Sequence, residues 1–474
     1  MTATAFLALL PLIMLAVAAI VVMLVIAFRR EHALAAGLAL IGLAIAFVAD
    51  WLAPAAQVTA LLVIDGYARF FIGLILAASF TVTLFSYGYL ENQDDNREEF
   101  YVLVLLATLG SMVLVASSHF VSFFLGLEIL SVSLYAMIAY TRARQISVEA
   151  GIKYLILAAA SAAFLLFGMA LVYAETGTME FARLAAALRA NGADVIALTG
   201  LAMIVVGVGF KLALVPFHLW TPDVYEGAPA PATAFVATVS KGAMFALLLR
   251  YSSVLGIQTY GSLFIAFGVI AIASMLVGNL LALLQNNVKR ILAYSSIAHL
   301  GYLLVAFLAS GALAVTAVAF YLTAYFVTTL GAFGVVTLLS NADRDADRID
   351  DYRGLFHRHP WLAGIFTAML LSLAGIPLTA GFVGKFYLVA AGVGSALWLL
   401  VIVLAVASAI GLFYYLRIVV AMYQPLLEGV PAPARVSLPI ASRVTLAVLT
   451  LLLVWLGVYP VPFIQIIQQL ARLI

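Results

Sequence analysis

Long apolar stretches recur along the whole sequence, and they restrict the folds open to it. Each holds roughly 20 residues with few charges, enough for one helix to cross the hydrocarbon core of a bilayer. Their approximate limits are 4–28, 33–52, 67–89, 99–117, 120–140, 148–174, 195–217, 231–254, 260–283, 289–309, 313–339, 359–393, 396–423 and 443–466. The twelfth is long and interrupted, so the count of fourteen could also be thirteen or fifteen. Because lipid offers no hydrogen bonds to a bare backbone, the predicted fold class is an all-α polytopic membrane protein of about 14 transmembrane helices.

The composition points the same way. Of the 474 residues, 66% are hydrophobic and only 9% are charged, whereas soluble domains carry about 25% charged residues. The apolar stretches run through all of 1–474, which predicts a single integral membrane domain. A net charge of +2 without a basic cluster argues against nucleic-acid binding. The sequence has no cysteine, which excludes disulfides, thiolate-held iron–sulfur clusters and covalently attached c-type haem.

The distribution of basic residues predicts the orientation. The first apolar stretch precedes Arg29 and Arg30, the reverse of a cleaved signal peptide, so we expect a retained helix with the N-terminus outside. Most other lysines and arginines between spans then fall on the cytoplasmic side, in agreement with the positive-inside rule. An even number of spans puts both termini on the periplasmic side. The high alanine content and the lack of cysteine favour a bacterial inner (plasma) membrane.

Five ionisable residues lie deep inside the apolar stretches: Glu128, Lys211, Lys241, His299 and Lys385. A charge at that depth costs roughly 2.5–3.5 kcal/mol, so each needs a polar neighbour or water. A lone buried histidine is more often a structural core residue, and paired charges can be structural too. One glutamate with three lysines near one level instead favours a proton or ion pathway. Lys289, near a helix start, is expected to snorkel, and the charged run 343–351 to be solvated.

Two of the stretches are interrupted beside their lysines. Pro216 follows Lys211 in the seventh, and Pro377 precedes Lys385 in the twelfth, together with three glycines. A proline in a helix frees backbone carbonyls, which need a partner inside a bilayer. Interrupted helices five spans apart suggest two inverted five-helix repeats, spans 4–8 and 9–13. The expected parts are a three-helix segment at 1–98, repeats at 99–254 and 260–423, and a C-terminal helix at 443–474.

These residues suggest how protons could move. A glutamate–lysine pair about 4 Å apart is worth about 4 kcal/mol at an effective dielectric near 20. Separating Glu128 from Lys211 would therefore release the lysine proton, which Lys241 could receive. His299 and water could relay it, and Lys385 could pass it on. Moving one proton against 100 mV costs about 2.3 kcal/mol, so a switch of this size is large enough.

Around these residues the sequence resembles the antiporter-like subunits of the proton-pumping NADH:quinone oxidoreductase, respiratory complex I. The matching stretches are LGLEILSVSLYAMIAY around Glu128, GFKLALVPFHLWTPDVYEGAPAP around Lys211, TVSKGAMF around Lys241, NVKRILAYSSIAHLGYLL around His299 and LAGIPLTAGFVGKFYL around Lys385. They cover about 120–390 in the order of the family. Lys385 favours the N branch of the family over the M branch, in which glutamate is usual at this position. The multi-subunit cation/proton antiporters share much of the same pattern.

The resemblance implies fourteen transmembrane helices with two inverted repeats and broken helices 7 and 12. It also implies a Glu128–Lys211 pair, a central Lys241, a relay at His299 and a terminal Lys385. The chain would be a proton-translocating subunit of a translocase without a redox centre of its own. NADH, FMN, iron–sulfur clusters and quinone would be bound by partner subunits, and the neighbours would be subunits M, K and J, with membrane lipids. The alternatives are a sodium/proton antiporter subunit and a purely structural membrane subunit.

Overall fold

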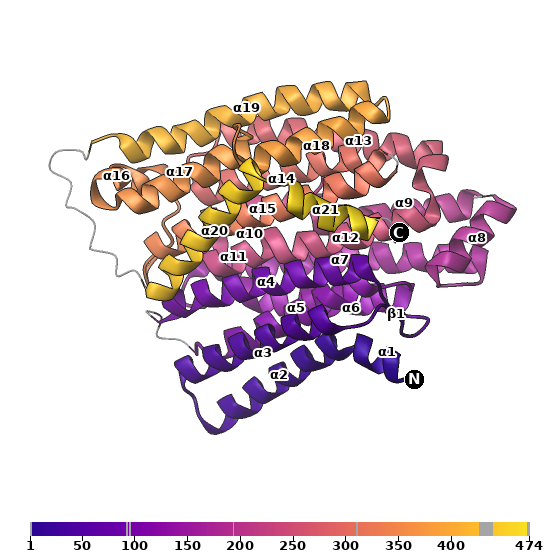
Figure 1. The fold of residues 1–474 in the computed structure, drawn as a ribbon, viewed down its shortest axis with the longest axis horizontal. Coiled ribbons are helices and arrows are strands. Elements are labelled where there is room, and N and C mark those ends of the chain that lie inside the picture. The colour runs from indigo at the N-terminus through magenta and orange to yellow at the C-terminus, as the bar shows by residue number, and fades with distance from the viewer. Residues whose placement is uncertain are drawn as a thin grey trace.

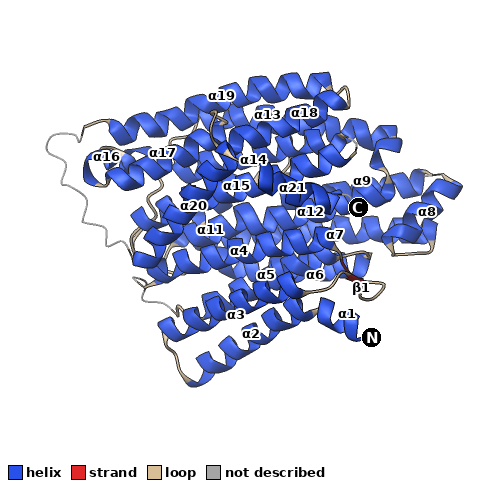
Figure 2. Ribbon diagram, in the orientation of Figure 1, coloured by secondary structure: helices blue, strands red, loops and turns tan. Residues whose placement is uncertain are grey.

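The computed structural model describes residues 2–91, 93, 96–192, 194–309, 311–425 and 439–471. Long helices lie side by side along one direction, so the molecule is one helical bundle (Figure 1). Helices make up almost all of the described secondary structure, as the blue ribbon of Figure 2 shows. The small sheet in the described part of the chain pairs β1 (Ala56–Gln57) with β2 (Val63–Ile64) in antiparallel register. The sequence pattern did not predict this hairpin.

Thirteen helical segments of the described residues are long and apolar enough to cross a membrane. They are α2 (Leu10–Phe28), α3 (His32–Leu52), α4 (Gly66–Leu90), α5 (Glu99–Ala116), α6 (Phe120–Ile138), α7 (Gln145–Thr176), α9 (Val195–Leu212), the continuous segment Ala230–Leu255, α13 (Gly261–Leu283), α14 (Val288–Leu308), α15 (Ala312–Leu339), α19 (Trp398–Tyr423) and α20 (Ile440–Val458). Two shorter apolar helices, α17 (Pro360–Ala374) and α18 (Ala380–Gly394), together form one interrupted span. Counting this pair once gives fourteen spans, which confirms the predicted fold class.

The remaining elements are short. They are α1 (Ala3–Ala8), α8 (Phe181–Asn191), α10 (Trp220–Gly227), α16 (Leu355–Arg358), α21 (Val461–Ala471) and the 3₁₀ turns η2 (Ile257–Thr259) and η3 (Ile349–Tyr352). The C-terminal part differs from the single helix predicted from the sequence, because α20 ends at Val458 and α21 begins at Val461. Pro460 lies between them, and a proline has no backbone N–H with which to continue a helix. The two chain ends, α1 and α21, point toward the same end of the bundle (Figure 1).

Three spans form the centre of the bundle. In the most apolar 18 residues of Ala230–Leu255 and of α14, 100% of the residues are buried, and in those of α15 94% are buried. In the corresponding stretches of α2, α19 and α20 only 33% are buried. The outer helices are nevertheless apolar on their exposed sides, as expected for helices that contact lipid. Lys241 and His299 therefore lie on the two most enclosed spans.

Both predicted helix interruptions are present. α9 ends at Leu212, Ala213 has a φ of 59°, and the next helix, α10, begins only at Trp220. α17 ends at Ala374, and Gly375 and Leu378 have φ values of 88° and 70° before α18 begins. The span Ala230–Leu255 contains a third irregularity that the sequence did not predict. It runs as α11 (Ala230–Phe235), a π-helical turn η1 (Val236–Ser240) and α12 (Lys241–Leu255).

Candidate functional site

Lys211 lies in the last turn of α9, immediately before the first helix interruption. Its side chain is buried, and its ammonium donates hydrogen bonds to Ser131 Oγ and Tyr154 OH, each at 3.0 Å. The same ammonium lies 5.6 Å from the centre of the Tyr154 ring. Two hydroxyls and an aromatic ring therefore surround this lysine at the end of a broken helix.

Glu128 lies on α6, one helical turn before Ser131, and so on the same side of the helix. Its side chain is half-buried. Among the described residues, no ion pair within 4.0 Å joins Glu128 to Lys211. The structure thus places the carboxylate on the face that meets Lys211, with the Ser131 hydroxyl as the direct partner of the lysine.

Lys241 begins α12, directly after the π-helical turn, and is 1% exposed. Its ammonium donates to Ser296 Oγ at 2.6 Å, and Tyr225 OH donates to the same oxygen at 3.3 Å. The ring centres of Tyr225 and Trp220, both from α10, lie 5.2 and 5.9 Å from the ammonium. The interruption of the seventh span therefore brings an aromatic helix against the central lysine.

His299 lies on α14, one turn beyond Ser296, and is buried. Its Nδ1 is 2.6 Å from Tyr321 OH, and its Nε2 is 3.3 Å from Tyr415 OH. The hydroxyl of Tyr415 is also hydrogen-bonded to Ser295 Oγ. Both ring nitrogens thus have a hydroxyl partner, which suits an imidazole that takes a proton on one side and releases one on the other.

Lys385 lies on α18, just beyond the second helix interruption. Its ammonium donates to the carbonyls of Leu373 and Ala374 at 2.9 and 2.8 Å, and to Ser408 Oγ at 2.7 Å. The two carbonyls are the last of α17, which the interruption leaves without helical partners. The lysine therefore supplies the hydrogen bonds that the broken helix lacks, and its ammonium lies 5.2 Å from the Tyr302 ring.

The five residues form two polar groups separated by one aromatic residue. Ser131, Lys211 and Tyr154 make up the first, and the second runs from Lys241 to Ser408. Trp220 lies between them. Its ring centre is 4.9 Å from that of Tyr154, and its Nε1–H donates to Phe210 O at 2.9 Å. The only polar atom of the indole is thus occupied, and the ring itself offers no group that can relay a proton between them.

The second group continues through aromatic contacts. The ring centres of His299 and Tyr302 are 5.4 Å apart, and Lys385 lies against the same tyrosine. The sequence revealed the five ionisable residues but none of these serine and tyrosine partners, because hydroxyls are common in apolar spans and carry no positional signal.

A charged cluster separate from these two polar groups lies at the end of the bundle where α19 ends. Lys289 is 0% exposed and donates to Asp345 Oδ2 at 2.6 Å, while Arg144 and Tyr89 donate to Asp345 Oδ1 at 2.8 and 2.7 Å. Asp345 is 6% exposed, so the predictions of a snorkelling Lys289 and a fully solvated run 343–351 are wrong. The sequence could not show that these segments meet, because they are far apart along the chain.

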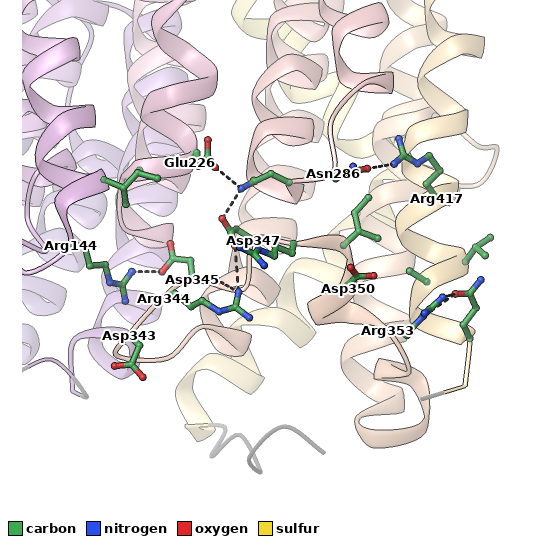
Figure 3. Close-up of a pocket in the computed structure, with 18 of the residues that line it drawn as sticks. Arg144, Glu226, Asn286, Asp343, Arg344, Asp345, Asp347, Asp350, Arg353 and Arg417 are labelled. Carbon is green, nitrogen blue, oxygen red and sulfur yellow. Dashed lines mark hydrogen bonds and ion pairs between the residues drawn. The ribbon is translucent and has the colours of Figure 1, made fainter. Parts of the chain in front are cut away.

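Burial and charge act in opposite directions on Asp345. Burial raises the pKa of its carboxyl, but the charges of Lys289 and Arg144 and the hydrogen bonds from Lys289 and Tyr89 outweigh burial and hold that pKa below its usual value. A cavity of about 1210 Å³ adjoins the cluster, and Figure 3 shows Arg144 and Asp345 pointing toward each other at its wall. In the described part of the chain, no three histidine, aspartate or glutamate side chains are grouped so that they could hold a metal ion.

Comparison with known proteins gives one consistent family. The family described as "NADH:quinone oxidoreductase/Mrp antiporter, TM" matches residues 117–411. The chain is 57% identical to the NADH-quinone oxidoreductase subunit N of Nitrosospira multiformis, over 97% of this chain and 94% of that protein. It is 51% identical to the subunit of the same name from Ectopseudomonas mendocina, over 99% and 97%. A chain of respiratory complex I from Thermus thermophilus with bound aureothin has a similar structure, with a TM-score of 0.82 at 32% identity over 96% and 98%.

Proposed function

Because the chain belongs to the NADH:quinone oxidoreductase/Mrp antiporter transmembrane family, we propose that it acts as the proton-translocating, N-type membrane subunit of respiratory complex I. The observation that carries this proposal is the row of buried groups along the bundle, from Glu128 through Lys211, Lys241 and His299 to Lys385. Each lysine is held by hydroxyls, carbonyls or rings, so each ammonium can lose its proton without leaving a permanent ion pair behind.

The proposed order of transfer follows the contacts. Movement of Glu128 toward Lys211 and away again changes the field at the lysine. A glutamate and a lysine brought to about 4 Å attract each other by about 4 kcal/mol, more than the roughly 2.3 kcal/mol of moving one charge against 100 mV. Lys211 then releases a proton toward Lys241 after water has entered beside Trp220. Ser296 connects Lys241 to the face of α14 that carries His299, and the histidine passes the proton toward Lys385.

The redox chemistry belongs to partner subunits in this proposal. NADH oxidation, FMN, iron–sulfur clusters and quinone reduction lie elsewhere in the complex, and the membrane neighbours are subunits M, K and J together with lipids. The relatives named NADH-quinone oxidoreductase subunit N support this assignment. The chain crosses a bacterial inner membrane, with both termini on the periplasmic side and the cavity beside Asp345 on the cytoplasmic side.

A subunit of a cation/proton antiporter is the second candidate, because the family description includes Mrp antiporters. An antiporter exchanges sodium for protons without electron transfer. The two functions therefore predict different effects of one lysine substitution on NADH oxidation and on the proton gradient.

The test replaces the central lysine by alanine, Lys241→Ala, and uses inverted membrane vesicles that contain the assembled complex. NADH oxidation through quinone and the proton gradient are measured against wild type. The matched control is Lys153→Ala, a lysine whose side chain is 44% exposed. We expect both activities to fall in Lys241→Ala and to persist in Lys153→Ala. Normal NADH oxidation and gradient together with lost sodium tolerance would instead identify an antiporter.

A further inference from the structure

The cavity of about 1210 Å³ is lined by polar and charged groups near the buried residues, and it offers two routes toward them. Its lining includes Arg144 and Asp345 on one side and Phe413, Leu416 and Arg417 of α19 on the other. Figure 3 shows Arg417 reaching Asn286 on this second side. A proton that enters from this end can move inward only along a series of groups that each accept and donate protons.

The Asp345 side does not continue. Asp345 holds Lys289, and the remaining hydrogen bonds of the Lys289 ammonium go to the carbonyls of Glu226 and Ala228, at 2.9 and 2.6 Å. A backbone carbonyl accepts a hydrogen bond but has no proton to pass on. The Tyr89 hydroxyl on Asp345 accepts from Arg144, so its hydrogen bonds also stay within the cluster. This side is therefore closed, and the carbonyl hydrogen bonds of Lys289 fasten α14 to the start of the span that contains Lys241.

The α19 side continues into a pair of tyrosines. Arg417 donates to Leu283 O and Asn286 Oδ1, at 2.8 and 2.7 Å, and Tyr414 lies one turn deeper on the same helix, a rise of about 4.5 Å. Tyr414 OH donates to Asn279 Oδ1 at 3.0 Å, and Asn279 lies one turn deeper than Leu283. Tyr414 thus lies between two residues that line the cavity, Phe413 and Arg417.

The tyrosine pair leads to His299. The rings of Tyr414 and Tyr415 are 4.4 Å apart, and the hydroxyl of Tyr415 is hydrogen-bonded to Ser295 Oγ. Tyr415 OH in turn lies 3.3 Å from His299 Nε2. Every member of this path is a hydroxyl or an imidazole, and each can accept one proton while it donates another.

A glycine on α19 leaves room for the path. A Cβ added at Gly411 would lie 3.0 Å from Asn279 Oδ1 and 3.3 Å from Tyr414 OH, closer than ordinary van der Waals contact. Asn279 also donates to Met275 O and Tyr302 OH, at 2.7 and 2.9 Å, so its amide is fixed. Asn279 is thus a positioning residue that orients Tyr414, and Gly411 is the position that permits the contact.

We propose that Tyr414 and Tyr415 form a proton-uptake route of the second repeat, which connects the cavity at the end of α19 to His299 without passing through Lys211 or Lys241. When Nδ1 of His299 carries the proton and donates to Tyr321, Nε2 accepts the Tyr415 proton, Tyr415 takes the Tyr414 proton, and Tyr414 takes one from water that enters from the cavity. This inference rests on the proposed function, in which His299 and Lys385 move protons, and it adds a second entry for those protons beside the one through Lys211 and Lys241.

The first test removes single hydroxyls in the whole complex, in sealed vesicles. Tyr415→Phe is compared with Tyr67→Phe, which also loses one buried hydrogen bond, that from Tyr67 OH to Ala246 O at 2.8 Å. We expect a several-fold lower rate of proton-gradient formation in Tyr415→Phe and little change in Tyr67→Phe. Equal pumping by both variants would overturn the route. Lys241→Ala, measured in parallel, separates the proposals: if it is impaired while Tyr415→Phe is normal, only the route is wrong, and if it pumps normally, the proposed function is wrong.

The second test blocks the cavity and remains decisive if Tyr415→Phe fails to assemble. The chain has no cysteine, so Leu416→Cys places one thiol at the cavity wall and Tyr423→Cys one on the same helix outside the lining. A membrane-impermeant, positively charged methanethiosulfonate is added to inverted vesicles, and pumping is measured before and after. The route requires a several-fold loss in Leu416→Cys beyond that of wild type and Tyr423→Cys. Equal effects on all three contradict it.

Discussion

At the scale of the residue, the proposed proton path from Lys211 to Lys241 depends on Trp220. Its ring lies between Tyr154 and Lys241, and its N–H donates a hydrogen bond to Phe210 O. Because the only polar atom of the indole is already bonded, we expect proton transfer from Lys211 to Lys241 to require the ring to move and water to take its place. In this conformation an apolar ring thus lies between the two lysine sites.

Replacing Trp220 should change the number of protons moved per NADH oxidised more than it changes the assembly of the complex. In Trp220→Ser the hydroxyl and the space left by the indole admit water, so we expect fewer protons moved per NADH while NADH oxidation continues. Trp220→Phe keeps the step apolar and should pump more like wild type. The proton-to-NADH ratio in reconstituted vesicles checks both variants. A wild-type ratio in Trp220→Ser would show that the indole separates nothing.

Residue chemistry was only partly visible in the sequence. Charges such as Lys241 stand out in apolar stretches because burying them is costly. Their partners do not, since a serine such as Ser296 or a tyrosine such as Tyr321 occurs in membrane helices for many reasons. That Lys211 contacts the hydroxyl of Ser131, one turn from Glu128, could not be predicted from the sequence either. It depends on how α6 packs against its neighbours.

At the scale of the element, the interruption between α17 and α18 is built around Lys385. Gly375 has a φ of 88°, a region that side chains disfavour, and a Cβ there would lie 2.8 Å from Lys385 Cδ. The carbonyls of Leu373 and Ala374 then point at the ammonium. Proline and glycine in the sequence predicted this break, whereas the π-helical turn before Lys241 has no such marker and was missed.

A methyl group at this interruption should displace the lysine. We expect Gly375→Ala to cost about 1–2 kcal/mol in backbone strain and to reduce pumping, because the Lys385 side chain must move. Gly364→Ala, on the same helix α17 with no atom within 4 Å of the new Cβ, is the matched control and should be neutral or slightly stabilising. Heat inactivation and proton pumping of the assembled complex are the measurements. A Gly375→Ala complex as active and stable as the control would contradict this account of the break.

At the scale of the whole molecule, Asp345 connects segments that are distant in the sequence. Tyr89 of α4, Arg144 before α7 and Lys289 of α14 all donate to its two oxygens. The cluster thus joins the N-terminal segment to both expected repeats at one end of the bundle. The number of spans could be predicted from apolar length alone, but these long-range contacts could not, since nothing local marks them.

Removing this carboxylate should weaken the bundle strongly. Asp345→Ala leaves the fully buried Lys289 without its anionic partner, a change that typically costs about 3–5 kcal/mol. We expect a clearly lower temperature of heat inactivation for the assembled complex. Asp343→Ala removes an exposed carboxylate two residues away and should have almost no effect. Equal heat stability of the two variants would show that the buried pair is not structural.

The same cluster predicts a dependence on pH. Because the pKa of folded Asp345 lies below its usual value of about 4, its stabilisation is complete above that pH and is lost as pH falls through the folded pKa. The difference in heat stability between wild type and Asp345→Asn should therefore be constant from pH 5 to 7 and shrink below about pH 4. A difference that grows on acidification would have the wrong sign.

In the proposed function, Lys211, Lys241 and Lys385 act as one proton pathway across both halves of the bundle. Residues that act as a unit are strongly non-additive. The most direct measurement is therefore the NADH-driven proton pumping of Lys211→Met, Lys385→Met and the double variant, in sealed vesicles with equal amounts of assembled complex. We expect each single variant to be impaired and the double variant to pump no less than the weaker single one. Losses that multiply in the double variant, or single variants that pump normally, would contradict a common pathway.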